Sequence, residues 1–193
     1  MSVAAIILAA GESRRMGQPK ALLPFRGGSF LSVLAETLSP HCLPVCAVFG
    51  ADAKRLMSFC PPDVQAAENP NYAQGMLTSL QAGLRALGNL PDRALFTLVD
   101  HPAVTRETIG ALLASTAEIA IPKFNGKRGH PVLIRRRIAE EILAEPYTSK
   151  LNTVMDRHAS EIHYLDLDDS GITDDIDDPA AYRNLLNREE AAA

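Results

Sequence analysis

The sequence has few cysteines, no long hydrophobic run and no excess of positive charge, and each shortage excludes a class of protein. Its 3 cysteines include no Cys-x-x-Cys pair, and the neighbouring His41, Cys42 and Cys46 lack a fourth ligand for zinc. The formal net charge of −4 provides no general attraction for nucleic acid. The apolar run at 3–10 is too short to span a bilayer, and no basic segment precedes it. We therefore expect a cytoplasmic protein with reduced, mostly buried thiols that binds neither nucleic acid nor membranes.

The chain length suits one domain, and no repeat, low-complexity tract or linker divides residues 1–193. Apolar runs of strand length alternate with helical patterns along most of the chain. These runs are continuous, as expected for parallel strands that are covered on both faces. The predicted strands cover residues 3–10, 45–50, 64–68, 94–100, 118–124 and 162–167.

Helical patterns fill the segments between these runs. Ser29 and Thr105 stand where their side chains could cap the helices that follow them. An Asn-Gly turn at Asn125 predicts a hairpin that returns as a strand to Ile134. The order of elements predicts an α/β fold with three α/β/α layers and a mostly parallel sheet to which the hairpin is added. The expected helices cover residues 30–38, 75–88, 106–115, 136–144, 151–158 and 179–193.

A basic loop containing glycine follows the first predicted strand. Gly11 comes directly after Ala10, at the carboxyl end of that strand, where open α/β sheets bind their ligands. Glycine lets the backbone approach a ligand closely, and the amides of such a loop can form an anion nest. Arg14, Arg15 and Lys20 add positive charge that suits a triphosphate. The sequence thus predicts a phosphate site, with a solvated surface loop as the alternative.

Two common phosphate-binding motifs do not describe this loop. A P-loop needs Gly-Lys-Ser/Thr, but Gly17 is followed by Gln18 and Pro19. The dinucleotide pattern needs a second glycine where Ser13 stands. The loop must therefore hold phosphate by a different arrangement.

The stretch LAAGESRRMGQPKALLPF, at 8–25, resembles the LAAGxSxRMGxxKxLLP signature of the MobA-like nucleotidyltransferases. It is most similar to the branch that cytidylylates the molybdenum cofactor. The resemblance implies the Rossmann-like fold of the nucleotide-diphospho-sugar transferases. It also implies that Gly11, Ser13 and the backbone around them, including Ala10, hold the β- and γ-phosphates. Arg15 would clamp the triphosphate and Lys20 would reach the α-phosphate.

Asp100 ends a buried-looking strand and is a candidate ligand for Mg²⁺, which carboxylates commonly hold against phosphates. The alternative role, capping the next helix, is better filled by Thr105. Asp100 resembles the Asp of the family's Asp-Gln-Pro motif. His101 replaces the glutamine, so whether this side chain contacts substrate stays open. Arg14 falls at a variable position of the family signature, although it adds to the charge of the loop.

The acidic segment DLDDSGITDDIDDP, at 166–179, allows two interpretations. It resembles the family's GxxDIDTP ending, whose first Asp completes the Mg²⁺ site and corresponds to Asp175. Its spacing also imitates an EF-hand calcium loop, but the preceding IHYLDL alternates like a strand where an EF-hand needs a helix. We therefore predict Asp100 and Asp175 as metal ligands and expect the other acidic residues to be solvated.

Two further segments extend the resemblance. In ENPNYAQGMLTSLQAGL, Gly75 and Ser79 would lie near the base and ribose, and Gly83 would permit close helix packing. In KRGHPVLI, Arg128 and His130 would face the acceptor, although a histidine on a hairpin can equally be structural.

The resemblance predicts a Mg²⁺-dependent enzyme that joins a nucleotide from CTP to molybdopterin and releases pyrophosphate. The product could pass to a molybdenum enzyme. No Ser-His-Asp or Cys-His arrangement suggests covalent catalysis. The family branch has a Gly-Asp-x-Gly-Ala-Arg stretch where this sequence has EPYTSKLNTVMDRH, so recognition of the acceptor is open. Alternatives are a GTP user, an enzyme acting on a sugar phosphate or another small phosphorylated acceptor, and a non-catalytic maturation factor for a molybdenum enzyme.

Overall fold

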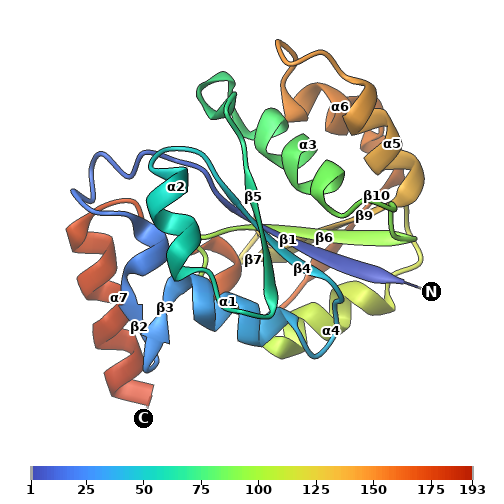
Figure 1. The fold of residues 1–193 in the computed structure, drawn as a ribbon. Helices are drawn as coiled ribbons and strands as arrows, with labels where there is room; N and C mark the ends of the chain where they lie inside the picture. The colour runs from blue at the N-terminus through green and yellow to red at the C-terminus, as the bar shows by residue number, and fades with distance from the viewer. Residues whose placement is uncertain (1, 193) are drawn as a thin grey trace.

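A central sheet separates two groups of helices in the computed structural model, which describes residues 2–192 (Figure 1). Within these residues the sheet has eight strands in the order β10-β7-β9-β6-β1-β4-β5, and β8 pairs with β7. The strands are β1 (Val3–Ala9), β4 (Val45–Phe49), β5 (Val64–Glu68), β6 (Arg93–Leu98), β7 (Ile119–Phe124), β8 (Lys127–Arg128), β9 (Val132–Arg135) and β10 (Ile162–Asp166).

The order of the strands reverses beside β1. From β1 the chain passes to β4 and then β5, and it afterwards returns to β6 on the other side of β1. The strand β1 pairs in parallel with both β4 and β6. A reversal of this kind leaves a crevice at the carboxyl ends of the two adjacent strands, which is where such sheets bind ligands. The ends of β1 and β6 are therefore the first place to look for a site.

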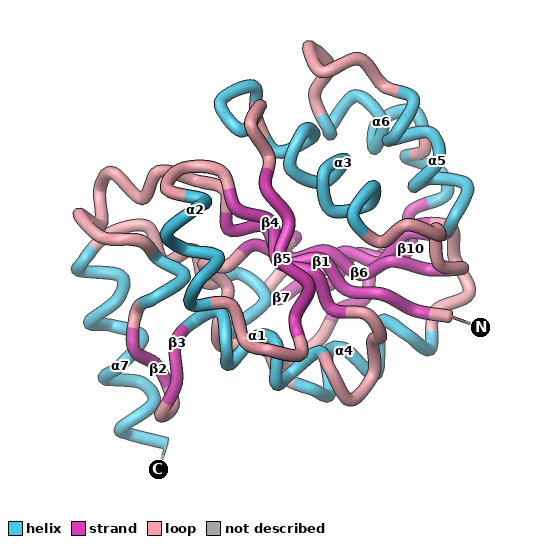
Figure 2. The backbone as a smooth tube through the Cα atoms, in the orientation of Figure 1, coloured by secondary structure: helices cyan, strands magenta, loops and turns pink. Residues whose placement is uncertain are grey.

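The helices cover both faces of the sheet, which confirms the predicted three-layer α/β fold (Figure 2). Ser29 Oγ accepts a hydrogen bond from Ser32 N (3.2 Å), and Thr105 Oγ1 accepts one from Thr108 N (3.3 Å), so both predicted caps are present. One face carries α1 (Phe30–Leu38), α2 (Ala53–Leu56), α4 (Arg106–Ala114) and α7 (Pro179–Ala192), and the other carries α3 (Met76–Ala86), α5 (Arg136–Ala144) and α6 (Leu151–Arg157).

The hairpin predicted at Asn125 is present, but its returning strand lies inside the sheet. Asn125 and Gly126 adopt positive φ angles of 49° and 77° in the turn between β7 and β8. The following strand, β9, pairs antiparallel with both β6 and β7. Its residues Val132, Leu133 and Ile134 are buried, which explains why this segment is as apolar as the parallel strands. Two short elements had no sequence prediction: α2 and a small separate hairpin of β2 (Pro24–Phe25) and β3 (Gly28–Ser29).

The cysteines and the lengths of the helices can be described for residues 2–192. Cys42, Cys46 and Cys60 are free thiols, and the first two are buried. Burial raises the pKa of both Cys42 and Cys46 to about 12, so these thiols stay protonated at neutral pH. None of the described helices combines the length and the apolar character that crossing a membrane requires.

The close approach of α3 to the sheet depends on Gly83. A Cβ atom at this position would lie 2.6 Å from Ile6 Cγ2 and 3.0 Å from Val48 Cγ2. We expect Gly83→Ala to lower the free energy of unfolding by about 1–3 kcal/mol, because overpacking outweighs the gain in helix propensity. Urea denaturation measures the effect. Gly110→Ala in α4 is the matched control, since a Cβ there meets nothing within 4 Å. Equal stability of the two variants would contradict the packing argument.

The acidic segment near the C-terminus is fastened to α4 by Asp169. This side chain is 8% exposed, and it accepts hydrogen bonds from the backbone N–H groups of Thr105 (3.0 Å) and Gly171 (2.9 Å). It also accepts from the hydroxyls of Thr105 (2.8 Å) and Thr108 (2.6 Å). The expectation that every acidic residue here except Asp175 is solvated is therefore wrong for Asp169. The strand β10 precedes the segment, so it lacks the helix of an EF-hand.

Candidate active site

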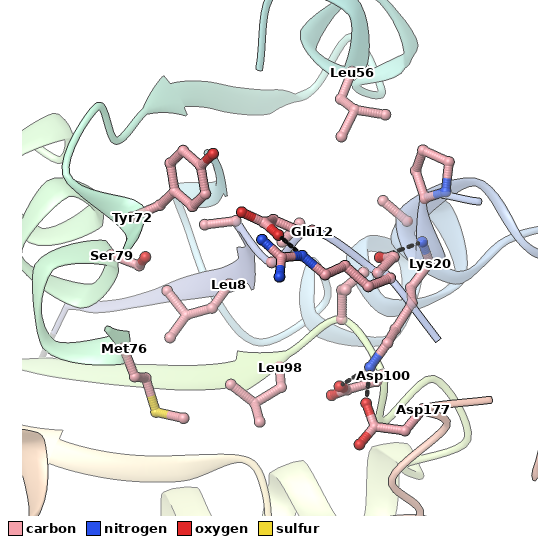
Figure 3. Close-up of a pocket in the computed structure, with 18 of the residues that line it drawn as sticks. Leu8, Glu12, Lys20, Leu56, Tyr72, Met76, Ser79, Leu98, Asp100 and Asp177 are labelled. Carbon is pink, nitrogen blue, oxygen red and sulfur yellow. Dashed lines mark hydrogen bonds and ion pairs between the residues drawn. The ribbon is translucent and has the colours of Figure 1, made fainter. Parts of the chain in front are cut away.

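A pocket of about 510 Å³ opens at the carboxyl ends of β1 and β6, where the strand order reverses. The loop after β1, the start of α3 and the end of β6 form its walls (Figure 3). Most of the residues predicted from the sequence meet there, although they come from distant parts of the chain. Those in the pocket wall are Ala10, Gly11, Ser13, Arg14, Arg15, Lys20, Gly75, Ser79 and Asp100.

The pocket has an apolar region and a charged region (Figure 3). Leu8, Leu98 and Met76 lie together at one end, whereas Lys20 and Asp100 lie at the other. Such a division suits a ligand with a flat, weakly polar part and a charged part.

The loop after β1 turns back so that its basic residues face the pocket. Ser13 has a positive φ of 51°, and its carbonyl accepts hydrogen bonds from the N–H groups of Met16 and Gly17 (3.1 Å each). Its hydroxyl accepts from the backbone N–H of Lys20 (3.1 Å). A Cβ atom at Gly11 would meet no protein atom within 4 Å. The backbone at Gly11 is therefore open to a ligand on the side from which its side chain is missing.

Lys20 lies between two carboxylates at the charged end of the pocket (Figure 3). Its Nζ donates to Asp100 Oδ2 (2.7 Å) and to Asp177, and its side chain is 11% exposed. Burial alone would lower the pKa of Lys20, but Asp100 and then Asp177 outweigh it and raise the pKa. The lysine therefore remains a cation at neutral pH.

Both oxygens of Asp100 have partners. Lys20 binds Oδ2, and His101 Nδ1 lies 3.0 Å from Oδ1. Burial would raise the pKa of Asp100, but the hydrogen bond from His101 and the charge of Lys20 lower it to about 2. The side chain is thus a fixed anion with a defined orientation.

Three carboxylates meet beside Lys20. Asp100, Asp175 and Asp177 each offer an oxygen, and these oxygens lie within 4.8 Å of one another. Burial, followed by the charges of Asp100 and Asp177, raises the pKa of Asp175, so Lys20 alone does not fully compensate the negative charge. Oxygen ligands in this number suit a hard divalent cation such as Mg²⁺ or Mn²⁺. The residues present therefore fit a metal ion.

Asp177 was missed in the sequence analysis, although it lines the pocket. The Asp-Ile-Asp pattern at 175–177 could have indicated Asp177, because an apolar residue between two acidic ones suggests that the segment is anchored in the core. Ile176 is 3% exposed, and its N–H donates to the carbonyl of Asp100 (3.2 Å). This anchor brings both Asp175 and Asp177 to the end of β6.

His130 does not line the pocket. Its ring packs edge-on against His101, with 5.0 Å between the ring centroids, and its Nδ1 is buried without a hydrogen-bond partner. Burial and then the neighbouring His101 lower the pKa of His130 to about 4, so the ring is neutral at neutral pH. Arg128 is exposed on β8 and donates to the hydroxyl of Tyr164 (3.4 Å). The structure thus places His130 against His101 and Phe96, outside the pocket wall.

His101 is expected to orient Asp100 for metal binding. His101→Leu removes the donor to Asp100 Oδ1, and affinity for Mn²⁺ should fall by about tenfold, as is typical for the loss of a hydrogen bond to a metal ligand. His101→Gln retains a donor and should stay within about threefold of the parent. Isothermal titration calorimetry with MnCl₂ measures both variants. Equal affinities for the two would exclude this role.

Comparison with known protein families places residues 5–162 within the domain described as MobA-like NTP transferase. The molybdenum cofactor cytidylyltransferase of Escherichia coli is 29% identical over 179 residues, which cover 90% of each chain. A probable molybdenum cofactor guanylyltransferase of Mycobacterium tuberculosis is 36% identical over 141 residues, covering 69% of this chain and 68% of the relative. The nicotine blue oxidoreductase of Paenarthrobacter nicotinovorans is 33% identical over 144 residues, with 68% and 70% covered.

Solved structures share the fold. A nucleotidyl transferase from Methanothermobacter superposes with a TM-score of 0.82 at 20% identity, covering 100% of this chain and 99% of the other. A Mycobacterium tuberculosis protein in complex with manganese superposes with a TM-score of 0.76 at 21% identity, covering 97% and 99%. At these identities the similarity describes the architecture, whereas the chemistry must be argued from the side chains.

Proposed function

This chain belongs to the MobA-like NTP transferase family and is a nucleotidyltransferase, and from that premise we propose that it transfers CMP from CTP to molybdopterin. The long match to the Escherichia coli cytidylyltransferase supports this choice of nucleotide and acceptor. The observation that carries the proposal is the meeting of Lys20 and Arg15 with Asp100 and Asp177 at one end of the pocket, where the carboxylate of Asp175 lies beside those of the other two aspartates. Cations can grip a triphosphate there beside carboxylates that hold its metal ion.

The proposed reaction needs no nucleophile from the protein. A terminal phosphate oxygen of the acceptor attacks the α-phosphorus of CTP in line, and the bond to the bridging oxygen of the pyrophosphate breaks. Lys20 stabilises the charge that develops on the α-phosphate. The backbone at Gly11 and the guanidinium of Arg15 hold the leaving pyrophosphate.

Asp100 and Asp175 are the proposed ligands of Mg²⁺, and the nearby oxygen of Asp177 is available to the same ion. When bound, the ion would neutralise charge on the phosphates. The hydrogen bond from His101 and the contact with Lys20 hold Asp100 in one orientation, which supports this proposed role.

The apolar end of the pocket is the proposed place for the base and ribose. Gly75 and Ser79 line it, and Ser79 Oγ accepts a hydrogen bond from Asn69 Nδ2 (3.0 Å). Gly75 has a φ of +114°, which favours glycine at this approach to α3. The sequence says less about where the acceptor binds. Arg157 is the arginine within 145–158, the segment that replaces the Gly-Asp-x-Gly-Ala-Arg stretch of the family branch. It forms ion pairs with Glu141 (2.9 Å) and Glu145.

An assay of pyrophosphate release tests the proposal. The protein is incubated with Mg²⁺, each of CTP, GTP, ATP and UTP, and molybdopterin or a panel of sugar phosphates. We expect CTP with molybdopterin to be turned over with one pyrophosphate per product. Turnover with GTP in place of CTP would overturn the assignment of the nucleotide. Turnover with a sugar phosphate but not with molybdopterin would overturn the assignment of the acceptor. Tight molybdopterin binding without turnover of any pair would favour a maturation factor.

A further inference from the structure

Asp177 binds both cations that the proposed function assigns to the nucleotide's phosphates. Its Oδ1 accepts from Lys20 Nζ, as Figure 3 shows, and its Oδ2 accepts from Arg15 Nη2. A phosphate chain directed at the same donors must displace this carboxylate. We propose that Asp177 is a built-in competitor for the phosphate site, which occupies Lys20 and Arg15 until a triphosphate replaces it. The inference rests on the proposed function, because that function assigns these two cations to phosphate.

The backbone near Asp177 is held independently of its side chain. The N–H of Ile176 donates to the carbonyl of Asp100 (3.2 Å), and the N–H of Asp177 donates to the carbonyl of Asp175 (3.1 Å). The side chain of Ile176 is buried in the core. The carboxylate of Asp177 can therefore turn away from the cations while the segment stays in place.

Releasing the two cations costs little. The side chain of Arg15 is 69% exposed and that of Asp177 is 26% exposed, so water screens their ion pair. Lys20 is the more buried cation, but its bond to Asp100 Oδ2 (2.7 Å) remains when Asp177 leaves. Displacement of Asp177 therefore leaves no buried charge without a partner, and the large free-energy cost of an unpaired buried charge does not arise.

The cluster of three carboxylates offers the side chain of Asp177 a second position once it has left the cations. An oxygen of Asp177 lies within 4.8 Å of ligand oxygens of Asp100 and Asp175. A divalent cation among these three carboxylates would attract Asp177 away from Arg15. The same side chain would thus favour a triphosphate that arrives with its metal ion over a free triphosphate, because the cations are freed more readily when the metal is present.

Asp175 provides the matched control. It adds the same negative charge to the cluster, yet the described contacts of Lys20 and Arg15 are with Asp100 and Asp177. Asp175→Asn and Asp177→Asn therefore change the local charge equally, but only the second releases the two cations. A general electrostatic effect would tighten phosphate binding in both variants, whereas competition by the carboxylate would tighten it only in Asp177→Asn.

The test measures binding of inorganic tripolyphosphate by isothermal titration calorimetry in EDTA. We expect Asp177→Asn to bind it about tenfold more tightly than the parent, and Asp175→Asn to stay within about threefold. Thermal unfolding checks that each variant is folded. Asp177→Ser, which is also uncharged, is the second variant and should behave like the asparagine form.

A double-mutant comparison locates the effect at Arg15. Arg15→Gln should weaken tripolyphosphate binding more in the Asp177→Asn protein than in the parent, because Asp177 already occupies the arginine in the parent. If Asp177→Asn binds no more tightly than Asp175→Asn, the competitor role is overturned while the proposed function stands. If neither the parent nor any variant binds tripolyphosphate or CTP, both proposals are overturned.

Discussion

Lys20→Ala is expected to lower kcat by about 10²–10³-fold and to leave the protein folded. The lysine is held at the charged end of the pocket by Asp100 and Asp177, so its ammonium is already in position when the phosphates arrive. Alanine removes this preorganised charge, and water cannot supply an equivalent in the same position. The side chain makes no contribution to either hydrophobic core cluster, and the fold should survive its loss.

Steady-state kinetics with saturating nucleotide measures this effect, and circular dichroism checks the fold. Lys54→Ala, which removes an exposed lysine from α2, is the control and should leave kcat unchanged. Lys20→Arg should fall between the parent and the alanine variant, because it keeps the charge but replaces a compact ammonium with a planar group. A kcat for Lys20→Ala close to that of the parent would remove the lysine from the mechanism.

Asp100→Asn is expected to abolish most metal-dependent turnover, with a loss of about 10³-fold or more. Asparagine has nearly the same size, and its one amide oxygen can still accept from Lys20 or from His101, so the change removes the charge with little change in shape. Because the pKa of Asp100 is lowered to about 2, the parent side chain is fully ionised at neutral pH, and the variant differs from it by a whole charge.

Activity measured against Mg²⁺ concentration, together with Mn²⁺ binding by calorimetry, tests the role of Asp100. Asp166→Asn is the matched control, since this aspartate is 74% exposed at the end of β10. It should leave both curves unchanged. Superimposable curves for Asp100→Asn and the parent would show that this carboxylate does not bind the metal.

The parallel core of the fold could be predicted because most of its strands are short continuous apolar runs in the sequence. The segments at 30–38, 64–68 and 136–144 have the predicted bounds as α1, β5 and α5, and the other long elements differ by a few residues at their ends. The caps Ser29 and Thr105 also depend only on neighbouring backbone groups. The inner position of β9 could not be read in this way, since pairing with β6 and β7 involves distant residues.

The candidate site was predicted in part. The loop residues and Asp100 stand at strand ends, and a parallel sheet brings such ends together, so their meeting in one pocket follows from the fold. The contact of Asp177 with Lys20 and Arg15 spans more than half of the chain, so the local Asp-Ile-Asp pattern could indicate the residue but not its partners. The burial of His130 could not be predicted for the same reason. Its ring packs against Phe96 in β6 and His101 in the segment that follows, which are distant in sequence.

By itself, the sequence determined the succession of the long strands and helices along the chain, the basic loop after the first strand and the family to which the chain belongs. These depend on periodicity, capping and motifs within short segments, which tertiary contacts seldom override. The tertiary structure alone decided that Asp177 lines the pocket, where it contacts Lys20 and Arg15. An acidic side chain is equally stable in solvent at most surface positions, and only the burial of Ile176 and its bond to the carbonyl of Asp100 select Asp175 and Asp177.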